Sequence, residues 1–310
     1  MPPVNIWFWV GFVAFVLAML ALDLGVFHRH PHVVRPKEAG VWTGVWVGLA
    51  LCFAAGLFFF AGRHASLTFL TGYVIEEALS VDNIFVMVLI FEYFRVPKNS
   101  QHRVLFYGIL GALVMRGAFI GAGAVLIQRF HWILYVFGAL LIVTGVRMAL
   151  NRDDGFEGDD NRIVRGLRRV LPLSDRFHDA HFTVVEAGRR LATPLLLVLM
   201  LVEITDLIFA IDSIPAIFGV TTDPFLVYTS NIFAVMGLRS LYFLLAAVVD
   251  RFHLLKYGLA VILSFVGFKM LAERWIEIDV ALSLAIILSV LAISIAASLV
   301  WTSDQKRDAP

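Results

Sequence analysis

Three carboxylic acids lie close together in an otherwise apolar stretch of the sequence. Glu76, Glu77 and Asp82 fall within the run YVIEEALSVDNIFVMVLIFEYF, which covers residues 73–94. A charged side chain at the centre of a bilayer costs about 2.5–3.5 kcal/mol on insertion scales. Acids that are kept in such a stretch generally line an ion pathway or pair with another charge.

A second apolar stretch has the same character. Residues 195–218 read LLLVLMLVEITDLIFAIDSIPAIF and contain Glu203, Asp206 and Asp212, and Asp23 lies near the end of the first apolar stretch. Buried like charges need a counter-charge or a proton. We therefore expect protons or a cation to compensate the surplus negative charge. These seven acids outnumber the four bases found inside all the apolar stretches of the chain, which are Arg116, Arg147, Arg239 and Lys269.

Helical spacing divides these acids between two faces. Glu76 and Asn83 stand at i and i+7 and share a face, whereas Asp82 lies about 240° from Glu76 on an ideal helix. The acids of the second stretch repeat this separation. Both acids of a pair reach one point only if the helix unwinds between them. Pro215 offers a cause for unwinding, because proline removes a backbone hydrogen bond.

The candidate ligands form an oxygen-rich set. Oxygen ligands suit Mg²⁺, Ca²⁺ and Mn²⁺, whereas Zn²⁺ and Cu⁺ prefer His or Cys. Arg116 and Arg239 are interpreted as gates, or as counter-ions to an empty site. In the alternative interpretation the acids only pair with arginines and have a structural role. We predict a metal site formed by Glu76, Asp82, Asn83, Glu203, Asp206, Asp212, Ser213 and Asp23.

Composition places these residues in a membrane protein. The chain has 310 residues, of which 60% are hydrophobic, and its mean hydropathy is +0.85. Its net charge of +1 gives no indication of nucleic-acid binding. The single cysteine, Cys52, excludes a disulfide within the chain.

Nine apolar stretches are long enough to span a bilayer. We therefore predict an all-α integral membrane protein with a single transmembrane domain, residues 1–310. The N-terminal stretch has no cleavable signal signature and is expected to be a span. The predicted spans are residues 6–27, 41–61, 68–93, 103–127, 131–150, 193–218, 225–248, 254–272 and 278–301.

Charge between the spans predicts the orientation. Most Lys and Arg residues outside the spans lie in the loops after the first, third, fifth and seventh spans and in the C-terminal tail. Such loops generally face the cytoplasm. We expect an inner or plasma membrane protein with its N-terminus outside and its C-terminus in the cytoplasm.

The longest predicted loop, residues 151–192, carries a basic amphipathic pattern. Apolar residues from Ile163 to Leu171 share one helical face, and arginines from Arg162 to Arg169 occupy the other. Such a helix is suited to lying on the anionic inner leaflet. We expect this loop to contact membrane lipid on the cytoplasmic side.

The two halves of the sequence resemble each other. ALSVDNIFV matches LIFAIDSIPA, which aligns Glu76 with Asp206, and TGVRMA at 144–149 matches VGFKML at 266–271. Three successive spans match three others, and an odd number of spans per unit requires opposite orientations in the membrane. An inverted repeat is therefore predicted, with units at 68–150 and 193–272 and a final span at 278–301.

Three longer motifs resemble those of the TerC family, in particular its Alx-type members. They are LDLGVFHR, TGYVIEEALSVDNIFV and LVEITDLIFAIDSIPAIFGVTTDPF, and the resemblance extends over all nine predicted spans. The family is associated with tellurium resistance and placed among LysE-like transporters that export manganese. The resemblance implies that the acids within these motifs belong to an ion pathway.

These observations favour a divalent cation transporter. The resemblance implies Mn²⁺ export from the cytoplasm by alternating access, and exchange for protons is a reasonable hypothesis because emptied carboxylates must be neutralised. The alternative is a non-transporting membrane component of a metal-stress, tellurium-stress or exoprotein-metalation complex.

No metalloprotease, serine hydrolase or P-loop signature occurs, so we predict no enzymatic activity and no catalytic residues. An intramembrane aspartyl hydrolase using Asp82 and Asp212 is a minor alternative.

Overall fold

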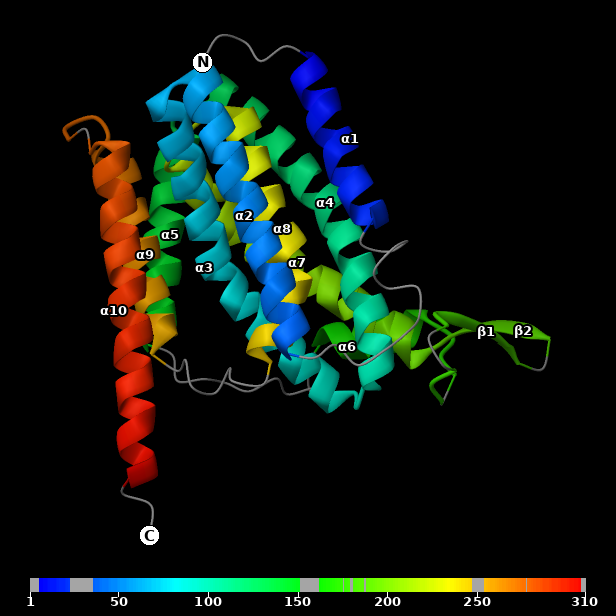
Figure 1. The fold of residues 1–310 in the computed structure, drawn as a ribbon. Coiled ribbons are helices and arrows are strands. Elements are labelled where there is room, and N and C mark those ends of the chain that lie inside the picture. The colour runs from blue at the N-terminus through cyan, green and yellow to red at the C-terminus, as the bar shows by residue number, and fades with distance from the viewer. Residues whose placement is uncertain are drawn as a thin grey trace.

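Long helices run side by side in a single bundle (Figure 1). The computed structural model describes residues 6–22, 36–150, 162–174, 176–178, 181–186, 188–246, 254–276 and 278–307. The elements are α1 (Ile6–Leu22), α2 (Pro36–Ala61), α3 (Arg63–Tyr93), α4 (Lys98–Arg129), α5 (Ile133–Leu150), α6 (Arg162–Val170), β1 (Thr183–Glu186), β2 (Arg189–Ala192), α7 (Pro194–Phe218), α8 (Pro224–Leu245), α9 (Leu255–Ala272) and α10 (Val280–Arg307).

Six of the described helices are long and apolar enough to cross a membrane: α2, α4, α5, α7, α9 and α10. Helix α1 is apolar but shorter, with 17 residues. Helices α3 and α8 have 31 and 22 residues, and they carry much of the buried polar side-chain set. An integral membrane fold built from helices is therefore confirmed.

Predicted boundaries differ from the observed ones by at most six residues. The predicted first span, 6–27, extends past α1, and its last residues lie outside the described part of the chain. Helix α10 continues to Arg307, beyond the predicted end at 301. A single residue, Gly62, joins α2 to α3 with φ of 89°, a conformation that glycine adopts readily.

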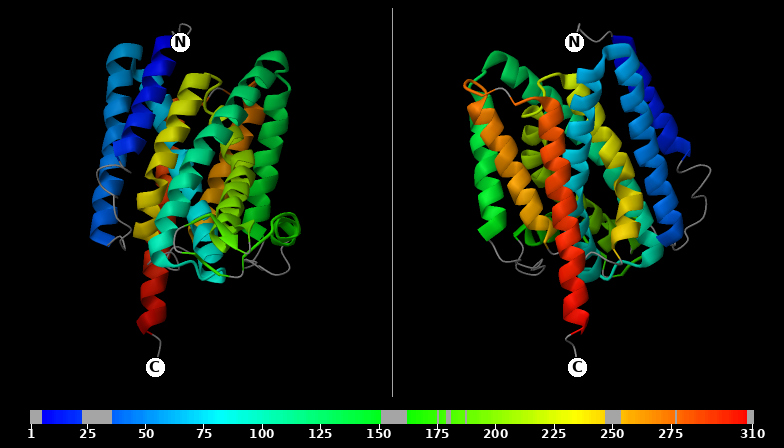
Figure 2. Two further views of the ribbon diagram at one scale, coloured as in Figure 1. Left: turned by 90° about the vertical axis from the view of Figure 1, so that its right-hand side faces the viewer. Right: turned by 60° about the vertical axis from the view of Figure 1, so that its left-hand side comes forward.

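A β-hairpin that projects from the side of the bundle follows α6 and precedes α7 in the chain (Figure 1), in a segment where the sequence predicted no strand. Strands β1 and β2 pair antiparallel, with Glu186 opposite Arg189, and Gly188 turns the chain with φ of 75°. The Arg103 guanidinium of α4 lies 5.2 Å from the centre of the Phe182 ring at the base of the hairpin. Helix α6 and the hairpin lie at the end of the bundle where α10 ends (Figures 1 and 2).

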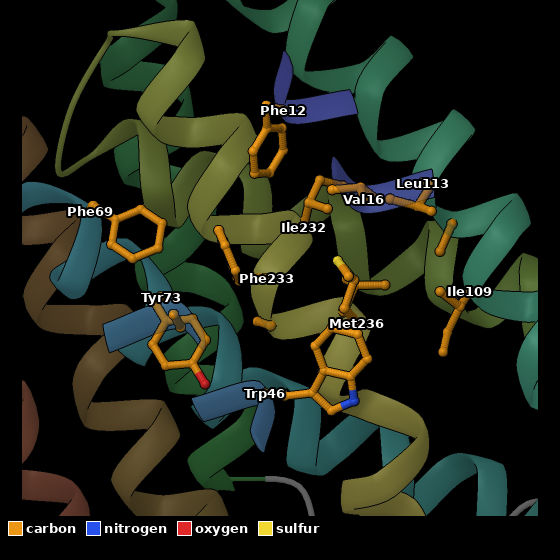
Figure 3. Close-up of a cluster of buried hydrophobic side chains, with 14 of the residues drawn as sticks. Phe12, Val16, Trp46, Phe69, Tyr73, Ile109, Leu113, Ile232, Phe233 and Met236 are labelled. Atoms are coloured by element: carbon orange, nitrogen blue, oxygen red, sulfur yellow. The ribbon is translucent and has the colours of Figure 1, made fainter. Parts of the chain in front are cut away.

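Aromatic side chains fill the core between the first helices and α8. The Phe53 ring centre of α2 lies 5.0 Å from that of Phe69 on α3 and 5.1 Å from that of Phe233 on α8. Rings at such distances add attraction beyond the burial of their apolar area. Figure 3 shows members of this cluster from α1, α2, α3, α4 and α8, among them Phe12, Val16, Trp46, Phe69, Tyr73, Ile109, Leu113, Ile232, Phe233 and Met236.

Helices α5 and α9 approach each other through glycines. An ideal Cβ built on Gly138 would lie 2.9 Å from the carbonyl oxygen of Gly267, and one built on Gly267 would lie 2.6 Å from that of Gly138. A Cβ on Gly145 would likewise meet the carbonyl oxygen of Ala260 at 2.7 Å. Small residues allow such close approach of helices in membranes.

The unwinding expected in the acid-bearing helices does not occur. Helix α3 is continuous through Glu76 and Asp82, and α7 is continuous from Pro194 to Phe218. Pro215 lies in the last turn of α7, after both Asp206 and Asp212, so the hydrogen bond that it removes leaves the helix between the acids intact. The prediction that each pair of acids converges on one point is therefore wrong.

Candidate functional site

One buried arginine joins acids from two helices. Arg116 of α4 donates a hydrogen bond to Glu76 of α3, and it contacts Asp206 of α7 through two nitrogens, Nε to Oδ2 at 3.1 Å and Nη2 to Oδ1 at 2.7 Å. The side chains of Glu76 and Arg116 are each 1% exposed, and that of Asp206 is 5% exposed. Paired hydrogen bonds between a guanidinium and a carboxylate are strong and fix the geometry of both groups.

Two asparagines complete this cluster. Arg116 Nη1 donates to Oδ1 of Asn231 on α8 at 3.1 Å, and Asn83 Nδ2 of α3 donates to Asp206 Oδ1 at 3.3 Å. Four helices, α3, α4, α7 and α8, therefore meet at one set of hydrogen bonds. We call these five residues, Glu76, Asn83, Arg116, Asp206 and Asn231, the arginine cluster.

The arginine cluster keeps unused acceptors. Among the described residues, Asn83 Oδ1 and the hydroxyl oxygen of the neighbouring Ser80 are buried without a hydrogen-bond partner, and the Ser213 hydroxyl lies next to the Glu76 carboxylate. With both acids ionised, the cluster carries two negative charges and one positive charge. Carboxylate, amide and hydroxyl oxygens are ligands that a hard divalent cation accepts.

Glu203 lies beside the arginine cluster on α7. Its carboxylate occupies the space next to Gly111 of α4, where an added Cβ would lie 2.0 Å from Glu203 Oε1. Its other oxygen, Oε2, is buried and has no hydrogen-bond partner in the described part of the chain. Glycine at this position of α4 therefore makes room for a carboxylate one turn from Asp206.

Asp212 faces a different helix. Its Oδ1 accepts a hydrogen bond of 3.0 Å from the Thr144 hydroxyl of α5, and its side chain is half-buried. Asp82 of α3 is also half-buried. Because α3 and α7 are regular helices, six residues turn each of these acids well away from Glu76 or Asp206.

Arg239 of α8 is buried on the other side of Asp206. It lines a small cavity of about 10 Å³ together with Asp206, Met87, Gly108 and Val202. A cavity of this size holds about one water molecule. The two arginines predicted as gates or counter-ions thus both lie next to Asp206.

Not every predicted ligand joins one group. Glu76, Asn83 and Asp206 share the arginine cluster, Glu203 and Ser213 lie near it on α7, and Asp82 and Asp212 lie elsewhere. Asp23 lies outside the described residues. Within the described residues, no three side chains of His, Cys, Asp and Glu group closely enough to hold a metal ion.

Glu77 belongs to a separate contact. Its Oε1 accepts a hydrogen bond of 2.6 Å from the Tyr73 hydroxyl one turn earlier in α3. A Cβ built on Gly237 of α8 would lie 3.6 Å from Glu77 Oε1 and from Trp46 of α2. Glu77 therefore faces α2 and α8, away from Arg116, in agreement with its omission from the predicted site.

The sequence missed Thr144 as a partner of an acid. Thr144 opens the TGVRMA motif that aligns with VGFKML, but its equivalent, Val266, has no hydroxyl. The repeat therefore hides this residue instead of revealing it. Asn231 is not among the predicted site residues, and its contact with Arg116 depends on packing between α4 and α8.

These features define an all-helical integral membrane protein with a buried charged cluster between its helices. The chain belongs to the TerC family, because residues 61–307 match the family described as "Integral membrane protein TerC family". The TerC resemblance seen in the sequence motifs is thus confirmed.

Full-length relatives support this assignment. The chain is 53% identical over 292 residues to a membrane protein of Myxococcus xanthus, covering 94% of this chain and 92% of that one. It is 50% identical over 295 residues, 92% of each chain, to the Escherichia coli protein named "Putative membrane-bound redox modulator Alx". A protein of the same name from Photorhabdus laumondii is 47% identical over 307 residues, 96% of each chain. No solved structure matches the chain.

Proposed function

We propose that this protein is a divalent cation transporter that exports Mn²⁺ from the cytoplasm by alternating access. The observation that carries the proposal is the arginine cluster: two buried acids from α3 and α7 are held by one guanidinium, and further acceptors beside them are unused. In this state Arg116 neutralises part of the negative charge. A divalent cation that displaces Arg116 gains the same carboxylates as ligands.

An inverted repeat supports the transport mechanism. In the alignment of TGVRMA with VGFKML, Gly145 corresponds to Gly267 and Gly138 corresponds to Ala260. If each residue is replaced by its counterpart in the other repeat, the contact between Gly138 and Gly267 becomes a contact between Ala260 and Gly145. The structure contains both contacts. Such an exchange is the property of a two-fold axis, here between α5 and α9, and it favours related units of opposite orientation.

The other two pairs of matched spans suggest how the site alternates. Arg116 in the predicted span 103–127 corresponds to Arg239 in the span 225–248, and Glu76 in the span 68–93 corresponds to Asp206 in the span 193–218. In transporters with inverted repeats, one repeat rocks against the other around a site near the midplane. In the opposite-facing state, Arg239 takes the place that Arg116 has here, and a cation or protons neutralise the acids during the exchange.

The proposed topology has nine crossings. Helices α1, α3 and α8 join the six apolar spans, and the N-terminus lies outside while the C-terminus lies in the cytoplasm. The position of the Arg-rich α6 at the end of the bundle where α10 ends supports this orientation (Figure 2), because basic segments favour the cytoplasmic side.

The names of the relatives suggest a second candidate, an indirect redox or metal-stress role without transport. The single cysteine, Cys52, is exposed on α2, so this chain has no pair of thiols for an exchange reaction. A redox role would therefore need a partner protein or a change in cytosolic metal. The transport proposal accounts for the buried acids, whereas the second candidate leaves them without a role.

Vesicles that contain the purified protein test the proposal. Mn²⁺ uptake is measured with and without a pH gradient for the wild type and for Asp206→Asn. We expect Asp206→Asn to lower uptake by a factor of about 100 or more, because the amide removes a buried charge that a dication needs. Glu77→Gln is the matched control, since Glu77 lies on the same helical bundle at similar depth but outside the arginine cluster.

Two results would oppose transport. Equal uptake by wild type, Asp206→Asn and protein-free vesicles would leave only the non-transporting role. A folded Asp206→Asn variant with wild-type uptake would show that the arginine cluster is structural. Thermal unfolding of each variant in detergent separates loss of transport from loss of fold.

A further inference from the structure

A polar cavity lies at the end of the bundle opposite α6. It has a volume of about 260 Å³ and lies where α7 and α9 end and α5 begins. A volume of about 10–15 Å³ suffices for one water molecule, so this cavity has room for a hydrated cation. Its lining residues are Leu134, Phe218, Gly219, Val220, Thr221, Thr222, Lys269, Met270 and Glu273.

Helix α7 connects the arginine cluster with this cavity in two steps. Asp212 follows Asp206 by six residues, and Phe218 follows Asp212 by another six, so each step rises about 9 Å along the helix. Asp212 faces α5 through Thr144, and Leu134 of α5 belongs to the cavity wall. Asp206, Asp212 and Phe218 lie on three different faces of α7, so the helix brings the two acids and the cavity wall to successive levels of the bundle, not to one continuous face.

The other side of Asp206 is much more closely packed. There the cavity beside Arg239 has a volume of only about 10 Å³, and Leu105, Ile109 and Leu238 form part of its wall. Apolar side chains of α4 and α8 form most of the wall of this small cavity, whereas hydroxyl and charged groups contribute to the wall of the larger one. The larger cavity begins about 18 Å along α7 from Asp206, at Phe218.

The groups in the larger cavity suit a cation in transit. The Glu273 carboxylate and the hydroxyls of Thr221 and Thr222 offer oxygen ligands, and the C-terminal end of α7 contributes partial negative charge. Lys269 lies in the same wall, and its Nζ donates to Ser283 Oγ of α10 at 3.1 Å. One base and one acid leave the wall without net charge, which favours passage over tight retention.

We propose that this cavity is the vestibule through which the divalent cation is exchanged with the compartment opposite α6. The structure represents the state in which that side is accessible and the side beside Arg239 is closed. This inference rests on the proposed transport function and adds its route: the arginine cluster, Asp212 with Thr144, and then the cavity between α5, α7 and α9.

Single-cysteine labelling tests the vestibule. Cys52→Ser removes the natural thiol, and Thr222→Cys then places one thiol in the cavity wall. Phe268→Cys is the control, because Phe268 is 53% exposed on the outer face of α9, next to Lys269 in sequence. A membrane-impermeant, positively charged methanethiosulfonate is added to vesicles sorted for orientation, and Mn²⁺ flux is measured before and after.

We expect the reagent to modify Thr222→Cys at least about tenfold faster than Phe268→Cys, because the thiolate that reacts requires water. Modification at Thr222→Cys should lower Mn²⁺ flux several-fold, and Mn²⁺ in excess should slow the modification. Glu273→Cys places a thiol at a second position of the cavity wall and should behave in the same way. It allows the test to be made even if Thr222→Cys does not fold.

Two outcomes would overturn the vestibule proposal. In the first, neither wall cysteine reacts faster than Phe268→Cys. In the second, both wall cysteines react but Mn²⁺ flux is unchanged. If the Cys52→Ser protein is folded and carries no Mn²⁺ before labelling, the transport function fails instead. The vestibule is then decided by whether Mn²⁺ slows labelling at Thr222→Cys, with slowing as support and no effect as contradiction.

Discussion

Helix α7 presents two acids to two different environments. Asp206 is 4% exposed and is paired with the Arg116 guanidinium between α3, α4 and α8. Asp212 is half-buried and accepts one hydrogen bond from the Thr144 hydroxyl of α5. Burying a charge costs more free energy than leaving it partly in water. The fully buried Asp206 carboxylate accordingly has a cation as its partner, whereas the half-buried Asp212 carboxylate has a neutral donor.

The two faces of α7 also differ in how their neighbours pack. On the Asp206 side, polar side chains join the helices, and an ion or a rearranged arginine can replace these contacts. On the Asp212 side, α5 is held against α9 by close glycine contacts that leave no space for a side chain. We interpret the α5–α9 pair as a rigid frame, and the Asp206 side as the part of the bundle that is joined by polar contacts.

The largest expected effect comes from Arg116→Gln, which breaks the charge pairing on the Asp206 side. Two buried carboxylates would lose their cation, and breaking a buried ion pair typically costs about 3–5 kcal/mol. The free energy of unfolding in detergent measures the loss. Arg103→Gln on the same helix is the control, because Arg103 lies near the hairpin and contacts the Phe182 ring.

The double variant Arg116→Gln with Asp206→Asn sharpens this test. Removing one acid together with the base relieves part of the unpaired charge, so the double variant should be more stable than Arg116→Gln alone. If Arg116→Gln unfolds like the wild type, the arginine cluster does not stabilise the bundle, and the contrast between the two faces of α7 is lost.

Part of this arrangement could be predicted from the sequence, because apolar length identifies membrane helices and acids inside them indicate buried charged contacts. Helical spacing also separated Glu76 from Asp82 correctly, but the expected unwinding near Pro215 was wrong. A proline in the last turn of a helix removes a hydrogen bond only near that end. Sequence alone could not reveal which acid would contact Arg116, since that contact depends on how α4 packs between α3 and α7.

The hairpin and Thr144 show a further limit. Strands β1 and β2 have four residues each and lie in a loop that was interpreted from its basic helical pattern. Thr144 lies in a motif that was used to detect the repeat, and its hydroxyl matters through a contact with α7 that no local pattern records. Contacts between helices distant in sequence are therefore the part that the sequence leaves open.

Gly267→Ala tests the frame on the Asp212 side. An added Cβ at Gly267 would lie 2.6 Å from the Gly138 carbonyl oxygen, so α5 and α9 must separate. Overpacking of this kind costs about 1–3 kcal/mol, and thermal unfolding in detergent measures it. Gly44→Ala on α2, where no atom lies within 4 Å of an added Cβ, is the control and should be neutral or stabilising. Equal stability of the two variants would contradict the rigid frame.

Thr144→Val tests the neutral partner of Asp212. Valine keeps the shape of threonine but cannot donate a hydrogen bond, so the Asp212 carboxylate loses the Thr144 hydroxyl as a donor. Because Asp212 is half-buried and water can replace part of the contact, the expected loss is about 1 kcal/mol. Chemical denaturation with Asp212→Asn as a comparison measures it, since the amide oxygen can still accept from Thr144. A loss as large as that of Arg116→Gln would mean that both acids are equally dependent on their partners.

Tyr73→Phe is expected to have the smallest effect and to mark the border of the site. It removes the hydroxyl that donates to Glu77 at 2.6 Å, and a hydrogen bond to a charged group contributes about 1.5–3 kcal/mol at most and often less. Glu77 is half-buried, so water can replace part of this contact, and we expect a loss below about 1 kcal/mol and unchanged Mn²⁺ uptake. Uptake in vesicles and unfolding in detergent are measured on the same preparation. Reduced uptake in a stable Tyr73→Phe protein would place Glu77 on the ion route. It would contradict the assignment of Glu76 to the site and of Glu77 to a separate face of α3.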